Sequence, residues 1–121
     1  MASLQMKRFE SPDEVRQFVG GKGKVELVDL GGNAVGLGTF EPGWRWSEHV
    51  KPLSGTDSCE VEHIGYVLEG RMRVVMDGGD ELEVGPGDVF HMPPNHDAWI
   101  VGDEACIMLD FGGLTGYAKA D

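Results

Sequence analysis

Glycine interrupts this sequence at short intervals, and this spacing limits the possible folds more than any other feature. Nineteen of the 121 residues are glycine. From residue 24 onward, the runs between turn signals are short, and they are apolar or alternate apolar with polar side chains, as in KVELVDL, RMRVVMDG and ACIMLDFG. Such runs, bounded by turns like those around Gly78 and Pro86, are typical of antiparallel strands. The pattern predicts an all-β sandwich or barrel.

The segment SPDEVRQFVGG near the N-terminus has a different pattern. Ser11 can cap a helix, Pro12 suits the first helical position, and Glu14 stands three residues after the cap, as in a capping box. The two glycines that follow would end such a helix. The segment therefore predicts a short helix over residues 12–19, packed on a barrel that spans residues 24–112.

Length and charge exclude several classes of protein. A chain of 121 residues suits one domain with a hydrophobic core, and we expect a single domain over residues 1–121. The formal net charge of -11 repels a phosphate backbone, and because no cluster of Lys or Arg offsets it, we expect no nucleic-acid partner. No stretch approaches the ~20 apolar residues that cross a bilayer, and no signal peptide is apparent. We expect no membrane partner and a cytoplasmic location.

The two cysteines, Cys59 and Cys106, fit that location if they are reduced, although two cysteines can also form a disulfide. Cys106 lies in the apolar run CIMLDF and is predicted to be a small buried hydrophobic residue.

The stretch CEVEHIGYVLEG, residues 59–70, carries a histidine on what we expect to be an inner strand face. Side chains alternate along a strand, so Cys59 and His63 share a face with small or apolar residues, while the opposite face carries two glutamates and Tyr66. A buried histidine needs a partner for each ring nitrogen. These partners can be neighbouring core groups, or a metal on one nitrogen and a hydrogen-bond acceptor on the other.

Two stretches resemble the two motifs of the cupin superfamily, whose members are small antiparallel β-barrels of the jelly-roll type. Residues 42–70 are similar to the first motif, G(X)5HXH(X)3-4E(X)6G. Residues 85–96, GPGDVFHMPPNH, are similar to the second, G(X)5PXG(X)2H(X)3N. The resemblance implies this fold, a metal site inside the barrel and pairing of two copies into a homodimer.

His63 takes the position of the metal-binding Glu of the first motif, counted back from Gly70. Two registers place the histidines that precede it. Counted forward from the glycine of PGW, the first is His49 and the second is Lys51, which cannot bind a metal while protonated. Counted back from His63, the two positions are Asp57 and Cys59. Both registers stay open.

The second motif contributes His96, which follows Asn95 directly instead of standing further along the turn. The resemblance therefore implies a metal bound by His63 and His96, completed by His49, Cys59 or both.

The ligand set bears on the choice of metal. Imidazole suits Zn, Fe, Ni and Cu, and the thiolate of Cys59 would favour tetrahedral Zn. His49, His63 and His96 without Cys59 would resemble the three-histidine Fe(II) sites of oxygen-activating cupins. We expect a divalent transition metal, Zn or Fe first, with Ni, Mn and Cu as further candidates.

Three other residues are assigned structural roles. His91 shares a strand with the second motif, which gives it no ligand role, and we expect a structural or surface residue. Trp44 and Trp46 are expected in the wall or core of the barrel, where aromatic rings would also suit a small organic ligand.

The resemblance implies a metal-binding cupin that acts on a small organic molecule, with oxygenase or isomerase chemistry. The sequence identifies no general base. The alternatives are a non-catalytic module that binds or senses a small molecule, and a structural cupin whose histidines are only packed.

Overall fold

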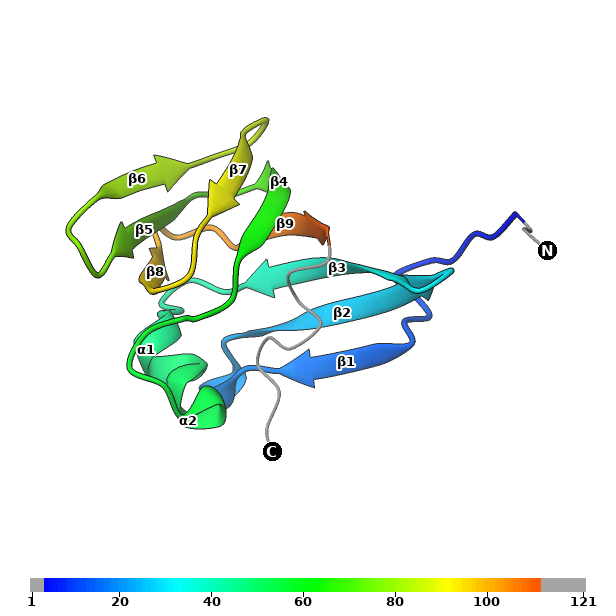
Figure 1. Cartoon of the computed structure of the whole chain (residues 1–121), viewed down its shortest axis with the longest axis horizontal. Helices are drawn as coiled ribbons and strands as arrows, with labels where there is room; N and C mark the ends of the chain where they lie inside the picture. Colours follow the sequence, from blue (N-terminus) through cyan, green and yellow to red (C-terminus); the bar gives the residue numbers. More distant parts are fainter. Residues whose placement is uncertain (1–3, 112–121) are drawn as a thin grey trace.

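Two antiparallel sheets face each other in the structure, a computed structural model that describes residues 4–111 (Figure 1). The larger sheet has the strand order β1-β2-β3-β9-β4-β7, and the smaller has the order β6-β5-β8. Every strand pair in both sheets is antiparallel. This arrangement confirms the predicted all-β antiparallel architecture.

The strands and helical segments have the following bounds along the chain: β1 Glu14–Gln17, η1 Val19–Gly21, β2 Gly23–Leu30, β3 Asn33–Phe40, α1 Trp46–His49, α2 Lys51–Ser54, β4 His63–Glu69, β5 Met72–Met76, β6 Glu81–Val84, β7 Val89–Met92, β8 His96–Ile100 and β9 Cys106–Phe111. The strands after residue 22 begin and end close to the predicted limits of the barrel. Residue 112, the last predicted barrel residue, lies outside the described residues.

The predicted helix over residues 12–19 is wrong. Glu14–Gln17 form strand β1, which pairs with β2 and adds an edge strand to the larger sheet. Only Val19–Gly21 are helical, as a single 3-10 turn. An isolated helix this short is marginal in water, whereas the free edge of β2 offers backbone partners for each residue. Phe18 is buried, but Val15 is exposed, so these residues do not form the single apolar face that a helix packed on the barrel would need.

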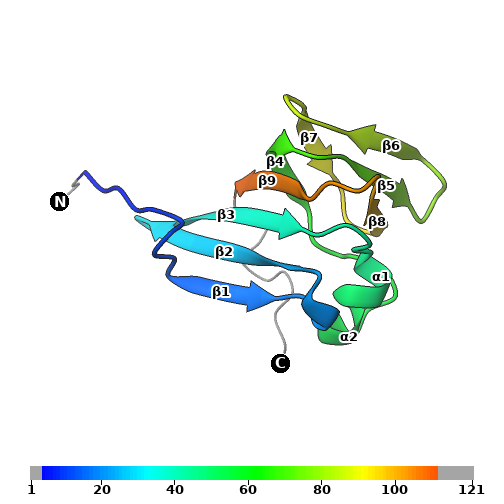
Figure 2. The same ribbon diagram turned by 180° about the vertical axis from the view of Figure 1, so that it is seen from behind.

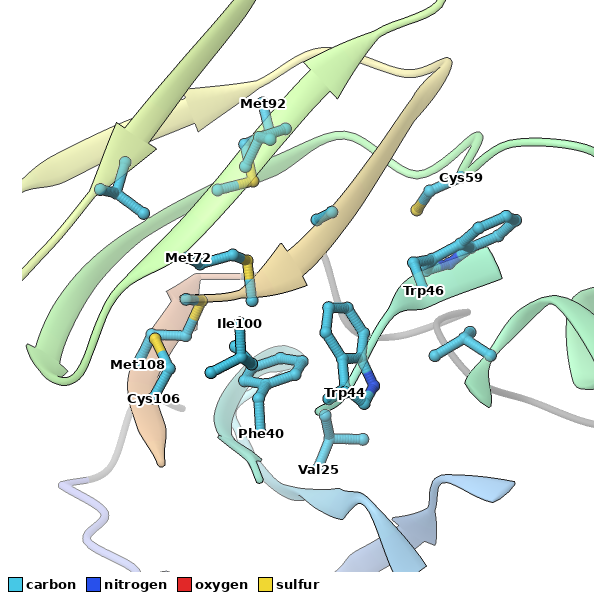
Figure 3. Close-up of a cluster of buried hydrophobic side chains, with 14 of the residues drawn as sticks. Val25, Phe40, Trp44, Trp46, Cys59, Met72, Met92, Ile100, Cys106 and Met108 are labelled. Atoms are coloured by element: carbon cyan, nitrogen blue, oxygen red, sulfur yellow. The ribbon is translucent and has the colours of Figure 1, made fainter. Parts of the chain in front are cut away.

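The core lies between the two sheets (Figure 3). Phe40 at the end of β3 packs edge-on against Trp44 with ring centroids 4.7 Å apart, and Phe18 stacks on Phe40 at 5.2 Å. Trp44, Trp46 and Cys106 are buried, as predicted. The contacts among Phe18, Phe40 and Trp44 pack the segment before α1 against the larger sheet.

The helices α1 and α2 follow each other at one end of the barrel, as both opposite views show (Figures 1 and 2). α1 packs against β8 and against η1. Arg45, the residue before α1, forms an isolated backbone β-bridge with Trp99 of β8. Its guanidinium lies 4.5 Å from the centre of the indole ring. Within residues 4–111, no helix is long and apolar enough to span a membrane.

Candidate metal centre

Three of the four predicted ligands lie together inside the barrel. The Cys59 sulfur and ring nitrogens of His63 and His96 are all within 4.8 Å of one another. Cys59 is 1% exposed, His63 6% and His96 3%. His63 is the first residue of β4 and His96 the first of β8, so strands from both sheets contribute to the cluster.

Backbone hydrogen bonds hold Cys59 against the turn that leads into β8. The Cys59 N–H donates to the carbonyl oxygen of His96 at 2.7 Å, and the Asn95 N–H donates to the carbonyl oxygen of Cys59 at 2.6 Å. Asn95 has a φ of 76°, in the left-handed region that asparagine enters more readily than most residues. This tight turn lets the histidine that directly follows Asn95 reach the interior.

Asp110 of β9 is the member of this cluster that the sequence did not predict. Its Oδ2 lies 2.6 Å from Nδ1 of His63, and both side chains are buried. Nδ1–H donates to the carboxylate, and Nε2 of His63 forms a hydrogen bond with the Cys59 sulfur at 3.7 Å. The signal was present: Asp110 is the one carboxylate in the run CIMLDF, and it alternates with Cys106 and Met108, which are buried.

Gly65 allows strands β4 and β9 to approach closely beside this pair. Gly65 is paired with Asp110, and a Cβ added to Gly65 would lie 2.0 Å from the carbonyl oxygen of Leu109 and 2.7 Å from the Phe90 ring. A larger residue at this position would push the strands apart. The glycine two residues after His63 therefore helps to bring the carboxylate to the histidine.

His96 is oriented in the same way as His63. Its Nδ1–H donates to the carbonyl oxygen of Pro93 at 2.7 Å, so Nε2 carries the free lone pair. Burial lowers the pKa of His96 from its usual 6.5, which favours the neutral ring that a metal requires. The two rings meet edge to face with centroids 5.6 Å apart.

His49, the fourth predicted ligand, lies outside the cluster. It ends α1, is only partly buried, and its Nδ1 accepts a hydrogen bond from the Arg45 N–H at 3.0 Å. Its ring lies beside Gly20, in η1. Counting forward from the glycine of PGW leads to His49. In the structure, however, this part of the chain forms α1 and α2 at the end of the barrel, away from the cluster.

His91 is exposed and faces away from the cluster, as predicted. Its Nε2 lies 3.0 Å from Oε2 of Glu62 on the outer surface.

A cavity of about 30 Å³ adjoins the two buried histidines. His63, His96 and Asp110 contribute its polar groups, and its apolar walls include Phe40, Trp46, Met72, Met92, Ala98 and Met108. A space of this size holds about one or two water molecules. It leaves room for a small ligand beside the histidines and excludes a larger one.

One distance between the donor atoms matches that of two ligands on one transition-metal ion, and the others are at most 4.8 Å. Bond lengths of about 2.3 Å to sulfur and about 2.0 Å to nitrogen separate two ligand atoms by roughly 3.5–3.8 Å in tetrahedral or trigonal geometry. The distance between Cys59 Sγ and His63 Nε2, 3.7 Å, is in this range. Burial raises the pKa of Cys59 to about 11, so metal binding at neutral pH must displace the thiol proton.

Comparison with known families supports this architecture. The model of the cupin domain family matches residues 36–112. No curated protein matches the chain.

Several solved structures have a similar fold. A protein of unknown function from Vibrio parahaemolyticus aligns with a TM-score of 0.59 at 17% identity, over 80% of this chain and 95% of that one. A protein of unknown function from Rhizobium leguminosarum aligns with a TM-score of 0.57 at 25% identity, over 77% of this chain and 83% of that one.

An oxalate decarboxylase from Lactobacillus farciminis, solved as a formate complex, aligns with a TM-score of 0.56 at 20% identity. The alignment covers 83% of this chain and 31% of the decarboxylase, so this chain corresponds to about a third of that enzyme. At this identity the similarity concerns the fold.

Proposed function

The chain belongs to the cupin family, and we propose that its barrel binds one transition-metal ion through Cys59 Sγ, His63 Nε2 and His96 Nε2. One observation carries the proposal: oxygen acceptors engage Nδ1 of both histidines, the Cys59 sulfur lies 3.7 Å from Nε2 of His63, and the thiol and both rings converge in one buried cluster. Histidines that serve only as core residues do not need this convergence. When bound, the metal would act as a Lewis acid toward a ligand in the adjacent cavity.

The surrounding residues would orient the ligands and exclude water. Asp110 holds the tautomer and ring orientation of His63, and the Pro93 carbonyl does the same for His96. Trp46 and Met92 cover the cavity with apolar surface. Burial strengthens the interaction between the metal and its ligands because the local dielectric constant is low.

We propose that an organic substrate or ligand would bind in a second, larger space. A groove of about 360 Å³ shares Met92 with the inner cavity, and its lining also includes Val74, Leu82 and His91. Its volume is in the range of small-molecule sites. Met92 lines both spaces, so movement of this flexible side chain would connect the groove with the metal. Such a connection would support a metalloenzyme that acts on a small organic molecule.

The alternative is a non-catalytic module that holds a small molecule in the groove. Turnover by the metal-loaded protein, followed as oxygen consumption or as substrate conversion, distinguishes the two. The described residues that line the inner cavity include no lysine or arginine. A carboxylate substrate would therefore depend on the metal for charge balance.

Metal titration tests the proposal. Protein stripped with a chelator should bind one equivalent of Zn, Fe, Mn, Ni or Cu, with a rise in melting temperature. His63→Ala should abolish binding, whereas the matched variant His91→Ala should bind like wild type. Equal metal content in the two variants, or none in the wild-type protein, would overturn it.

We further propose that two copies pair through the outer face of the larger sheet. Ile64, Leu68, Val89 and Phe111 are exposed there on the neighbouring strands β4, β7 and β9. The net charge of -11 makes two copies repel each other at charged surfaces, so an apolar face is the favourable contact. Light scattering should report a dimer, and Ile64→Glu should yield monomers of unchanged melting temperature at low protein concentration.

We also propose a cytoplasmic location, because Cys59 and Cys106 are both free and a reducing compartment keeps thiols in that state. Cell fractionation tests it.

A further inference from the structure

Thioether sulfur atoms surround the cavity beside the three proposed ligands. Met72, Met92 and Met108 are buried and line this cavity together with His63 and His96. Figure 3 shows the three methionine side chains turned into the barrel interior, where Cys59 also lies. The interior next to the proposed ligands is therefore unusually rich in sulfur for a space of about 30 Å³.

Met92 has a closer relation to the ligands than the other two methionines have. It pairs directly with His63 across strands β4 and β7, and both side chains are on the inner face. Directly paired residues have Cβ atoms about 4.5–5.5 Å apart. Met92 also precedes Pro93, whose carbonyl oxygen binds Nδ1 of His96. The strand register and the chain connection thus place Met92 beside both histidines.

This donor set suits a soft ion. Thiolate and thioether ligands select Cu(I), and two histidines with one cysteine and a weakly bound methionine form the ligand set of blue-copper sites. Zinc in structural sites has four strong ligands, whereas only three are grouped here among the described residues. Manganese prefers oxygen ligands, and the one carboxylate that lines the cavity, Asp110, is engaged by His63.

We propose that the site of Cys59, His63 and His96 selects copper over zinc and manganese, and that the Met92 thioether is an additional ligand for Cu(I). This inference rests on the proposed function, since it concerns the same three ligands. It adds the identity of the metal and a fourth, sulfur ligand that neither cupin motif contains.

Competition between metals tests the selectivity. Chelator-stripped full-length protein is titrated anaerobically with Cu(I) against a chromophoric Cu(I) chelator, and separately with Zn(II) against a zinc indicator. Met92→Leu keeps the apolar volume and removes the sulfur. We expect it to weaken Cu(I) binding about tenfold and to change zinc binding less than about twofold.

Met108→Leu is the matched control, since Met108 lines the same cavity but pairs with Gly38 and Val67 instead of a proposed ligand. This variant should bind both metals like wild type. An equal effect of Met92→Leu on Cu(I) and zinc, or no effect on either, would overturn the inference. So would zinc binding that is tighter than Cu(I) binding in the wild-type protein.

X-ray absorption of the Cu(I) form counts the sulfur ligands directly. We expect two sulfur neighbours in the wild-type protein and one in both Met92→Leu and Cys59→Ser. A single sulfur neighbour in wild type would remove Met92 from the site. Protein that binds zinc through the three ligands but does not prefer Cu(I) would refute the copper inference alone, whereas protein that binds no metal would refute the proposed function as well.

Discussion

The four histidines of this chain form two contrasting pairs. Each has a ring nitrogen in a polar contact, to Asp110 or Pro93 for the inner pair, and to Glu62 or Arg45 for the outer pair. His63 and His96 are buried with their remaining nitrogens directed to one place, whereas His49 and His91 lie on separate outer segments. A satisfied hydrogen bond therefore does not distinguish a candidate ligand here. Burial and convergence of the second nitrogen do.

The largest expected effect concerns the core that supports the inner pair. Phe40→Ala should lower the free energy of unfolding by ~3–5 kcal/mol, because it removes a ring packed on Phe18 and Trp44 and leaves a cavity. Val15→Ala, at an exposed position of the edge strand β1, should cost less than about 0.5 kcal/mol. Urea unfolding of both variants measures the difference. Equal losses would mean that the inner and outer faces do not differ in packing as described.

The next effect tests which residue completes the ligand set. Cys59→Ser should weaken metal binding by more than about a hundredfold, since loss of a ligand exceeds the usual effect of losing its hydrogen-bonded partner. His49→Ala should bind metal like wild type, because its ring is outside the cluster. Isothermal titration of the stripped proteins measures both. The reverse ranking would restore the register in which His49 is the ligand.

One buried carboxylate and one exposed carboxylate, each beside a histidine, allow a matched test of how a ligand ring is oriented. Asp110→Asn should weaken metal binding about 10- to 100-fold, because the carboxylate that holds Nδ1–H of His63 is replaced by an amide. Glu62→Gln makes the same chemical change beside His91 on the surface and should leave metal binding unchanged. Circular dichroism checks that both variants are folded. Similar affinity in the two variants would show that Asp110 does not orient a ligand.

The smallest expected effect is a pH dependence of stability in the metal-free protein. Burial lowers the pKa of His96 in the folded state below 6.5, so the unfolded chain takes up a proton on this residue at higher pH than the folded protein does. The contribution of neutral His96 is therefore complete above about pH 6.5 and declines as the pH falls below it. His96→Gln should reduce this decline in urea unfolding measured between about pH 7 and 5. An unchanged slope would place the pH dependence elsewhere.

Local patterns predicted most of the barrel correctly, and the reason is physical. Alternation of side chains is a property of the strand itself, so the sequence around His63 predicted which face of β4 is buried without knowledge of its neighbours. The N-terminal segment shows the limit of this approach. Its capping residues favour a helix locally. The free edge of β2 lies outside this segment, and pairing with that edge favours strand β1 instead.

By itself, the sequence determined the all-β class, the inward direction of Cys59 and His63, and the candidacy of His96, because strand periodicity and turn chemistry are local. Only the tertiary structure placed Cys59, and not His49, beside His63 and His96, and only it revealed Asp110 as the partner of His63. These results depend on contacts between residues far apart in the chain: the bridge between Cys59 and His96, and the pairing of β4 with β9. A metal site forms where separate strands meet, and that meeting is set by the packing of the whole barrel.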